Sequence, residues 1–148
     1  MVNVRVAVPS DASTLAGYVV AEAHEAEARE LDQGAALAAV LAALADPSIA
    51  RYWIAEDDGE PVGAIAVTRE WSDWNNGYCW WIQFVFVVPE RRGKGVLGAL
   101  VDHVRAEMRR EHGVELRLLV HPENARAARA YENLGFVRLP YIAMALRD

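Results

Sequence analysis

Three glycines and three basic side chains fall within eight consecutive positions, and together they could bind a phosphate group. The stretch runs from Arg91 to Gly98 and reads Arg-Arg-Gly-Lys-Gly-Val-Leu-Gly. Glycines let backbone N–H groups approach a ligand closely, and a helix that starts here adds partial positive charge. A turn of this kind binds anions. The sequence therefore predicts that it holds the pyrophosphate of a coenzyme.

The same stretch matches or approaches two other glycine motifs, and the rest of the chain argues against both. Gly93 to Gly98 fits G-x-G-x-x-G, the dinucleotide fingerprint. A dinucleotide-binding fold starts with that turn, whereas about 90 residues with four candidate strands come first here. A Walker P-loop needs Ser or Thr directly after Lys94, where this chain has glycine. A turn that is glycine-rich only in order to bend is the remaining alternative.

The overall composition is that of a globular protein with a small-molecule partner. The chain has 148 residues, of which 53% are hydrophobic and 24% charged, and its net charge is −6. This length predicts one domain, residues 1–148, with its own core. Nucleic-acid binders usually carry a basic surface. The acidic balance therefore argues against nucleic acid and favours a cationic partner.

The single cysteine and the N-terminal residues predict a cytoplasmic protein. Cys79 has no partner for a disulfide or for a Cys-x-x-Cys metal site, and we expect no bound metal. A chain without disulfides fits a reducing compartment. The N-terminus lacks the apolar core of a signal peptide. Since the longest apolar stretch, residues 35–45, is too short to span a bilayer, we expect no membrane partner.

Hydrophobic periodicity predicts strands and helices along the whole chain. The strands are predicted at residues 3–8, 52–56, 62–68, 79–88, 116–120, 136–138 and 141–146. The helices are predicted at residues 12–29, 35–45, 96–110 and 124–134. Residues 79–88 are nearly all apolar, which is typical of a strand covered on both faces. The order of these elements predicts an α/β fold with one mixed sheet and helices on its faces.

Two motifs in this chain resemble those of the GNAT superfamily of N-acetyltransferases. The family's coenzyme motif, Arg/Gln-x-x-Gly-x-Gly/Ala, is matched from Arg92 onward except at its last position. Leu97 stands there in place of a small residue, and Gly98 follows directly. The second motif, Asn-x-x-Ala-x-x-x-Tyr-x-x-x-Gly-Phe, is matched at every position from Asn124 to Phe136. Both motifs occur in the family's order and on the expected elements. The resemblance covers most of the chain.

A narrower resemblance involves the tryptophan-rich region. Residues 70–74 read Glu-Trp-Ser-Asp-Trp and residues 80–83 read Trp-Trp-Ile-Gln, which is similar to a small bacterial branch of the superfamily. That branch does not indicate the acetyl acceptor.

The resemblance implies the GNAT fold, a mixed and mostly antiparallel sheet of about seven strands flanked by about four helices. It also implies acetyl-CoA as the co-substrate. In such enzymes the central strand separates from its neighbour, and the pantetheine arm pairs with the exposed edge, here Val85, Phe86 and Val87. The backbone N–H of Val87 would polarise the thioester carbonyl, an effect worth roughly 3 kcal/mol of barrier. The implied pyrophosphate site consists of Arg92, Gly93, Lys94, Gly95, Val96, Leu97 and Gly98, and Asn124 would bond to the pantetheine arm or to nearby backbone.

Tyr131 is the general acid that the resemblance implies. A phenol is protonated at neutral pH and can pass a proton to a leaving thiolate, whose pKa is about 8.5 in the analogous cysteine. The alternative is a helix tyrosine that only packs on the sheet.

The acceptor side is predicted from acidic and aromatic residues, which could attract and enclose a cationic amine. These candidates are Glu25, Glu27, Glu70, Asp73, Trp74, Trp81 and Gln83, and Glu22 lies on the same predicted helix as the first two. Each acidic residue could equally lie on a solvated surface, and the tryptophans could simply fill the core. The identity of the general base stays open.

These observations predict an N-acetyltransferase that moves the acetyl group of acetyl-CoA to a primary amine by direct attack in a ternary complex. Two alternatives remain: an acyl-CoA-binding or sensing module without catalysis, and a protein acetyltransferase acting on lysines or N-termini. Dimers are common in the family, and the predicted C-terminal strand pair is a candidate homodimer interface.

Overall fold

Two long strands form an antiparallel hairpin through the middle of the sheet. β3 (Glu60–Ser72) and β4 (Gly77–Val87) are the longest strands of the computed structural model, which describes residues 1–148. A turn at Asn75 and Asn76 joins them, and Asn76 takes the left-handed φ of 50° that the asparagine-glycine sequence favours.

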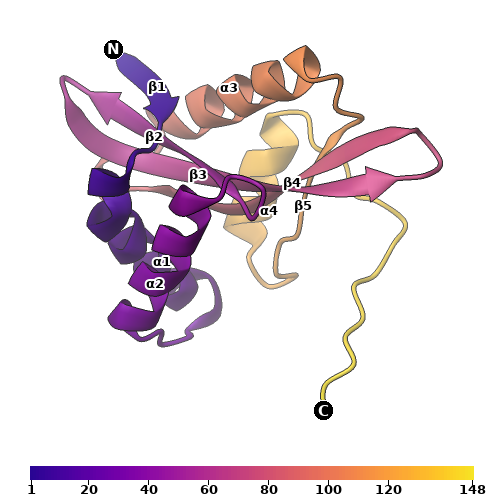
Figure 1. The fold of residues 1–148 in the computed structure, drawn as a ribbon, viewed down its shortest axis with the longest axis horizontal. Helices are drawn as coiled ribbons and strands as arrows, with labels where there is room; N and C mark the ends of the chain where they lie inside the picture. Colours follow the sequence, from indigo (N-terminus) through magenta and orange to yellow (C-terminus); the bar gives the residue numbers. More distant parts are fainter.

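The sheet has five strands in the order β1-β2-β3-β4-β5 (Figure 1). β1 (Val2–Val6) and β2 (Arg51–Asp57) continue the antiparallel pairing outward from β3. β5 (Leu116–Leu118) pairs in parallel with β4 and forms the other edge. The predicted mixed, mostly antiparallel sheet is therefore confirmed, with five strands rather than about seven.

Helices cover both faces of this sheet. α1 (Ala12–Glu27) and α2 (Gln33–Ala45) lie on one face and α3 (Val96–Arg110) on the other, as Figure 1 shows. Each face has its own hydrophobic core: Leu15 and Val40 pack in the first, and Leu100 and Val104 in the second. A fourth helix, α4 (Ala125–Asn133), follows β5. The four predicted helices are all present, and α1 ends at Glu27 because Ala28 turns left-handed at φ 52°.

A β-bulge interrupts β4 at Gln83. Ala66 pairs with Phe84, whereas the next residue of β3, Val67, pairs with Ile82, so that Gln83 is an extra residue. An extra residue shifts the inward–outward alternation by one position. Trp80 and Ile82 accordingly pack in the core under α3, while Phe84 and Phe86 pack in the core under α1 and α2. The bulge thus changes which face each side chain of β4 reaches.

The two predicted C-terminal strands are wrong. Residues 136–138 and 141–146 form no strand, and Figure 1 shows this segment leaving the body of the molecule. A strand needs a neighbour for its backbone groups, and this segment has none in its own chain. β5 is also shorter than predicted and ends at Leu118.

Gly63 allows β3 and β4 to approach each other at the end of β4. A Cβ atom at this position would lie 2.7 Å from the carbonyl oxygen of Phe86 and 3.3 Å from Cγ1 of Val96. No side chain can move to relieve the contact with the backbone oxygen, so the strand itself would have to shift. Gly63 therefore keeps the end of β4 in place.

We predict that Gly63→Ala lowers the free energy of unfolding by about 1–3 kcal/mol through overpacking. Urea denaturation followed by circular dichroism measures the change. Gly17→Ala is the matched control, because a Cβ there meets no atom within 4 Å and alanine favours a helix. An unfolding midpoint for Gly63→Ala at or above that of the wild type would contradict the close approach.

Candidate active site

β4 loses its neighbour on one side where the bulge begins. The pairing of β4 with β5 ends at Ile82 and Leu118. Val88 donates its N–H to the carbonyl oxygen of Val62 in β3, at 3.0 Å. Since successive residues of a strand point their backbone groups to opposite edges, the N–H groups of Val85 and Val87 point to the open edge. An extended ligand could pair with this edge as an added strand would.

A glycine turn follows β4 directly. Pro89–Arg91 forms a single 3₁₀ turn, and then Gly93 and Gly95 adopt left-handed φ values of 74° and 88°. These φ values explain why both residues are glycine. A Cβ at either position would meet no atom within 4 Å, but any residue with a side chain would be strained at such a φ. Gly95 is the N-cap of α3. The chain therefore turns sharply into a helix whose first turn faces the open edge of β4.

The first turn of α3 offers free backbone donors. Ala99 is the first residue whose N–H bonds back along the helix, to the carbonyl oxygen of Gly95 at 3.0 Å. The N–H groups of Val96, Leu97 and Gly98 precede it and have no partner inside the helix. Three adjacent donors at a helix N-terminus favour an anion such as a phosphate.

Two of the three basic side chains of the turn form ion pairs or hydrogen bonds within the protein. Arg91 forms an ion pair with Asp57, and this pairing holds the pKa of the Asp57 carboxyl below its usual range. Arg92 donates to the carbonyl oxygen of Val87 at 2.9 Å and to Glu25 at 2.7 Å. Lys94 is exposed and is the only lysine of the chain. Arg92 thus ties α1 to the end of β4.

A cavity of about 570 Å³, called the site cavity below, lies between these elements. Its walls come from α1, the end of β4, the glycine turn, the start of α3 and α4. Most of the residues predicted to bind the coenzyme line it: Val85, Phe86, Val87, Arg92, Gly93, Gly95, Val96, Leu97, Gly98 and Asn124. Lys94 does not line it. The motifs quoted from the sequence are therefore brought together in one place.

Asn124 is the N-cap of α4, and its side-chain oxygen already accepts a hydrogen bond. Its Oδ1 accepts a hydrogen bond from the N–H of Ala127 at 3.2 Å, as an N-cap does. The side-chain amide group keeps its two donor hydrogens for a ligand in the site cavity.

Tyr131 of α4 also lines the site cavity. Its ring packs edge-on against the ring of Phe136, with 5.8 Å between the ring centroids. Burial, together with the negative charge of Glu22, raises the pKa of Tyr131 to about 12. The phenol is therefore a proton donor that stays protonated well above neutral pH.

Glu22, which the sequence places on the first helix with Glu25 and Glu27, lines the site cavity from α1 and acts on Tyr131 through its charge. Burial raises the pKa of Glu22, and the neighbouring charges of Glu27 and Glu25 raise it further. Glu22 and Glu25 lie one turn apart on the same helix, so both reach the site cavity.

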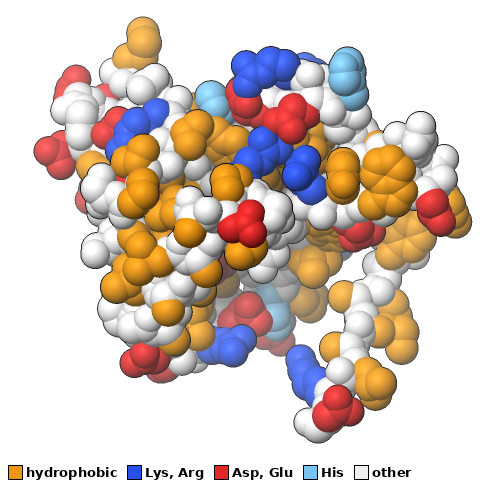
Figure 2. Space-filling view, in the orientation of Figure 1, with side chains coloured by type: hydrophobic (Ala, Val, Ile, Leu, Met, Phe, Trp, Pro, Cys, Tyr) orange, Lys and Arg blue, Asp and Glu red, His pale blue; other side chains and the backbone are white.

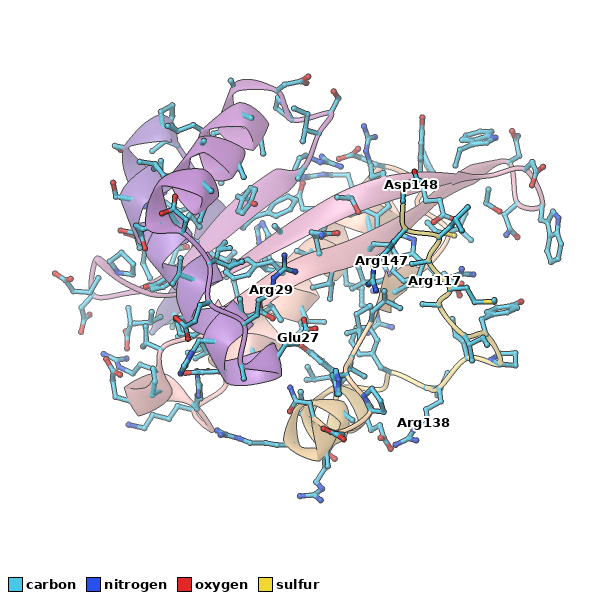
Figure 3. The ribbon with its side chains drawn as sticks, turned by 90° about the horizontal axis from the view of Figure 1, so that it is seen from below. Glu27, Arg29, Arg117, Arg138, Arg147 and Asp148 are labelled. Atoms are coloured by element: carbon cyan, nitrogen blue, oxygen red, sulfur yellow. The ribbon has the colours of Figure 1, made fainter.

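The acceptor-side candidates are divided between two regions. Glu25 lines the site cavity, whereas Glu27 does not and ends α1, where Figure 3 labels it. Gln83 is the exposed bulge residue. Trp81 donates its indole N–H to Glu70 at 3.0 Å and lies outside the site cavity.

Asp73 and Trp74 lie at the tip of the β3–β4 hairpin, which Figure 1 shows extending past the helices. β4 runs from Gly77 to Val87, so the tip is about 30 Å from Val87 at roughly 3.3 Å per residue. Glu70, opposite Cys79, is about 25 Å away by the same measure. These three residues therefore lie far from the Val87 N–H within one chain, and their contact with an acceptor stays a prediction.

No group of three or more His, Cys, Asp or Glu side chains is arranged to hold a metal ion. No helix combines the length and apolar character needed to cross a membrane.

A model of the acetyltransferase (GNAT) family matches residues 13–136 of the sequence. The chain belongs to this family. The match contains the open edge of β4, the glycine turn and α4 with Tyr131. No significant match was found among curated proteins.

Solved structures of several acetyltransferases share the fold over nearly the whole chain. A possible acetyltransferase from Clostridium difficile 630 is 32% identical, with a TM-score of 0.92 over 100% of this chain and 98% of that one. The ribosomal-protein-alanine N-acetyltransferase from Brucella melitensis biovar Abortus 2308 is 19% identical, with a TM-score of 0.80 over 100% and 99%. The aminoglycoside N-acetyltransferase AAC(6')-Iy, solved with CoA, is 17% identical, with a TM-score of 0.83 over 99% and 95%.

We predict that Gly95→Asp raises the Kd for CoA at least 100-fold, which corresponds to a loss of about 2.7 kcal/mol of binding free energy. The carboxylate would place a negative charge beside the donors of α3, where a pyrophosphate would bind. Isothermal titration calorimetry with CoA measures the loss.

Gly59→Asp is the matched control for this charge. Gly59 also has a left-handed φ, 79°, with open space around it, but it lies outside the site cavity. The Gly59→Asp variant should lower the free energy of unfolding about as much as Gly95→Asp does, and it should bind CoA with wild-type affinity. Unchanged CoA affinity in Gly95→Asp would exclude the glycine turn as the phosphate site.

We predict that Glu22→Gln lowers the pKa of Tyr131 below about 12, because the negative charge that disfavours the phenolate is removed. A pH titration of tyrosine ring carbons by NMR, assigned with Tyr131→Phe, measures it. Glu90→Gln is the control, since the charge of Glu90 raises the pKa of Tyr18 instead. Identical Tyr131 titrations in wild type and Glu22→Gln would contradict the coupling.

Proposed function

We propose that this GNAT protein transfers the acetyl group of acetyl-CoA to a primary amine by direct attack in a ternary complex. One observation carries the proposal: an unpaired strand edge, a turn with free backbone donors and a half-buried tyrosine face the same site cavity. Each would act on a different part of an acyl-CoA.

The residues present fit the coenzyme. The N–H groups of Val96, Leu97 and Gly98 suit a pyrophosphate, and the open edge of Val85 and Val87 suits the amide groups of a pantetheine arm. Backbone groups would make most of these contacts. The side chain of Phe86 is buried in the core on the α1 side, and its backbone groups point toward β3, so Val85 and Val87 would make the backbone hydrogen bonds to the arm.

The thioester would lie at the inner end of this edge. The N–H of Val87 would donate to the carbonyl oxygen as that oxygen gains negative charge, which is where a fixed donor lowers a barrier most. The carbonyl oxygen of Val87 already accepts from Arg92, which helps to hold the peptide in place. Val87 would therefore act through its backbone.

Tyr131 would protonate the departing sulfur. Its pKa of about 12 keeps the proton in place at neutral pH. The same shift makes full transfer to a thiolate, with a pKa of about 8.5 in the analogous cysteine, less favourable than for an ordinary tyrosine. The phenol would therefore donate a hydrogen bond to the sulfur as the carbon–sulfur bond breaks, and the proton would follow.

The acidic side chains of α1 favour a positively charged acceptor. Glu22 and Glu25 line the site cavity, and Glu25 is paired with Arg92. Glu22, whose pKa is raised, is the better placed of the two to take a proton from an ammonium group. Glu22 is thus the candidate general base. The class of acceptor that these side chains favour is an amine.

The test is thiol release from acetyl-CoA, measured over a panel of small amines, polyamines, aminoglycosides and peptides with free N-termini. Release that depends on a small amine supports the proposal. Turnover with peptides alone would indicate a protein acetyltransferase. CoA binding in calorimetry without turnover on any amine would favour an acyl-CoA sensor, and absence of CoA binding would overturn the site altogether.

We predict that Tyr131→Phe lowers kcat about 100-fold with the best amine and leaves the Kd for CoA nearly unchanged. The substitution removes only the hydroxyl group, so the ring packing on Phe136 is kept. Steady-state kinetics and calorimetry measure the two quantities.

Tyr52→Phe is the control, because burial also raises the pKa of Tyr52 but this residue packs in the core outside the site cavity. Its kcat should match the wild type. If Tyr131→Phe keeps the wild-type rate across the pH range, Tyr131 is not the acid.

A further inference from the structure

Three arginines line the site cavity, and only Arg126 has no acidic partner. Arg91 is paired with Asp57, and Arg92 is paired with Glu25. Arg126, on the first turn of α4, forms no ion pair and no side-chain hydrogen bond, and it is exposed. A guanidinium group at the mouth of a cavity therefore keeps its five donor hydrogens for a ligand.

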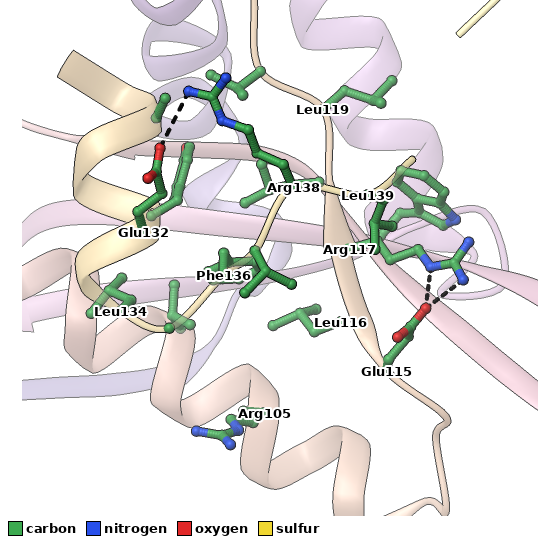
Figure 4. Close-up of a pocket in the computed structure, with 18 of the residues that line it drawn as sticks. Arg105, Glu115, Leu116, Arg117, Leu119, Glu132, Leu134, Phe136, Arg138 and Leu139 are labelled. Atoms are coloured by element: carbon green, nitrogen blue, oxygen red, sulfur yellow. Dashed lines mark hydrogen bonds and ion pairs between the residues drawn. The ribbon is translucent and has the colours of Figure 1, made fainter. Parts of the chain in front are cut away.

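The acidic residue of α4 does not neutralise this arginine. α4 also contributes to the wall of another cavity, of about 1090 Å³, between α3, β5 and α4, which is called the second cavity below. Glu132 is the one acidic residue of α4, and it lines the second cavity and not the site cavity. Figure 4 shows it there, accepting from Arg138 at 3.5 Å. Arg126 thus faces the site cavity with its positive charge uncompensated by its own helix.

Arg126 lies at the same end of the sheet as the glycine turn. β5 runs parallel to β4, so the carboxyl ends of the two strands lie at one end of the sheet. α3 follows β4 and α4 follows β5, and both helices therefore begin near that end. Tyr131 comes five positions after Arg126 in α4, about 7.5 Å along the helix axis at roughly 1.5 Å per residue. A ligand whose sulfur lies beside Tyr131 thus has Arg126 within reach of its phosphate end.

Coenzyme A carries a further phosphate besides its pyrophosphate, a phosphomonoester on the 3′ oxygen of the ribose. A phosphate of this kind has a charge of about −2 near neutral pH. The backbone donors of Val96, Leu97 and Gly98 suit the pyrophosphate and leave the 3′-phosphate without a partner. A guanidinium group binds a phosphate with two parallel hydrogen bonds, so Arg126 offers what the backbone donors do not.

We propose that Arg126 binds the 3′-phosphate of coenzyme A and makes the site selective for the complete coenzyme. The inference rests on the proposed function, because it takes the pyrophosphate to lie at the glycine turn. Arg126 stands at a position that the motif Asn-x-x-Ala leaves open, so the contact comes from this chain and not from the motif. On the face drawn in Figure 2, basic side chains are interspersed with acidic ones and form no single basic patch. Selectivity therefore depends on an individual unpaired side chain.

The contact distinguishes two classes of acyl donor. Dephospho-CoA and the phosphopantetheine arm of an acyl carrier protein both present a pantetheine thioester, but neither has a 3′-phosphate. Free thioesters of coenzyme A keep the contact with Arg126, and the other donors lose it. Because the guanidinium group is exposed, water and salt weaken the interaction, and the expected advantage of CoA over dephospho-CoA is about 10-fold.

Isothermal titration calorimetry with CoA and with dephospho-CoA tests the assignment. The wild type should bind CoA about 10-fold more tightly than dephospho-CoA at low salt. Arg126→Gln should bind the two ligands with nearly equal Kd, because only its affinity for CoA falls. Arg126→Lys should keep part of the preference, since the ammonium group retains the charge but loses the two-pronged geometry. Glutamine and lysine favour a helix about as well as arginine does, so α4 is retained in both variants.

Arg129→Gln is the matched control. Arg129 is an exposed arginine one turn further along α4 that does not line the site cavity, and its variant should keep the wild-type preference for CoA.

Three outcomes would overturn the assignment while the proposed function stands. The first is equal binding of CoA and dephospho-CoA by the wild type. The second is an equal loss of affinity for both ligands in Arg126→Gln, since Arg126 would then contact another part of the coenzyme. The third is loss of the preference in Lys94→Gln and not in Arg126→Gln, which would assign the 3′-phosphate to Lys94. A wild type that binds neither ligand would overturn the proposed function together with this inference.

Discussion

The extra residue at Gln83 controls how the layers of this protein meet. Before it, β4 sends Trp80 and Ile82 into the core under α3; after it, Phe84 and Phe86 enter the core under α1 and α2. The pairing with β5 stops at Ile82, immediately before the bulge. The same local event therefore gives each core its side chains and uncovers the edge of Val85 and Val87. Without the bulge, the open edge would have neither its position nor its orientation.

Much of the site could be predicted from the sequence, because its contacts are local. The glycine turn needs left-handed residues at Gly93 and Gly95, and α4 needs a cap at Asn124, so the residue types reveal the geometry. The bulge could not be predicted, since a run that is apolar on both faces conceals a shift in alternation. The effect of Glu22 on Tyr131 could not be predicted for a related reason: the two residues are more than 100 positions apart in sequence.

The C-terminal segment shows the other limit of pattern reading. Residues 141–146 have the composition of a strand, and yet they form none. Whether an apolar segment becomes a strand depends on what lies beside it, and that information is not local. Tyr131 lines both the site cavity and the second cavity, between α3, β5 and α4. A molecule in the second cavity would therefore also change the environment of the tyrosine.

The glycine turn contains Lys94, and no other lysine exists in the chain. The only other primary amine is the N-terminus, which forms an ion pair with Asp57 at 3.1 Å. An enzyme that handles activated acyl groups thus offers almost no side chain of its own for accidental acylation. The position of Lys94 also makes it a natural point of attachment: an amine-directed label will mark essentially one side chain, and that side chain is exposed beside the turn without lining the site cavity.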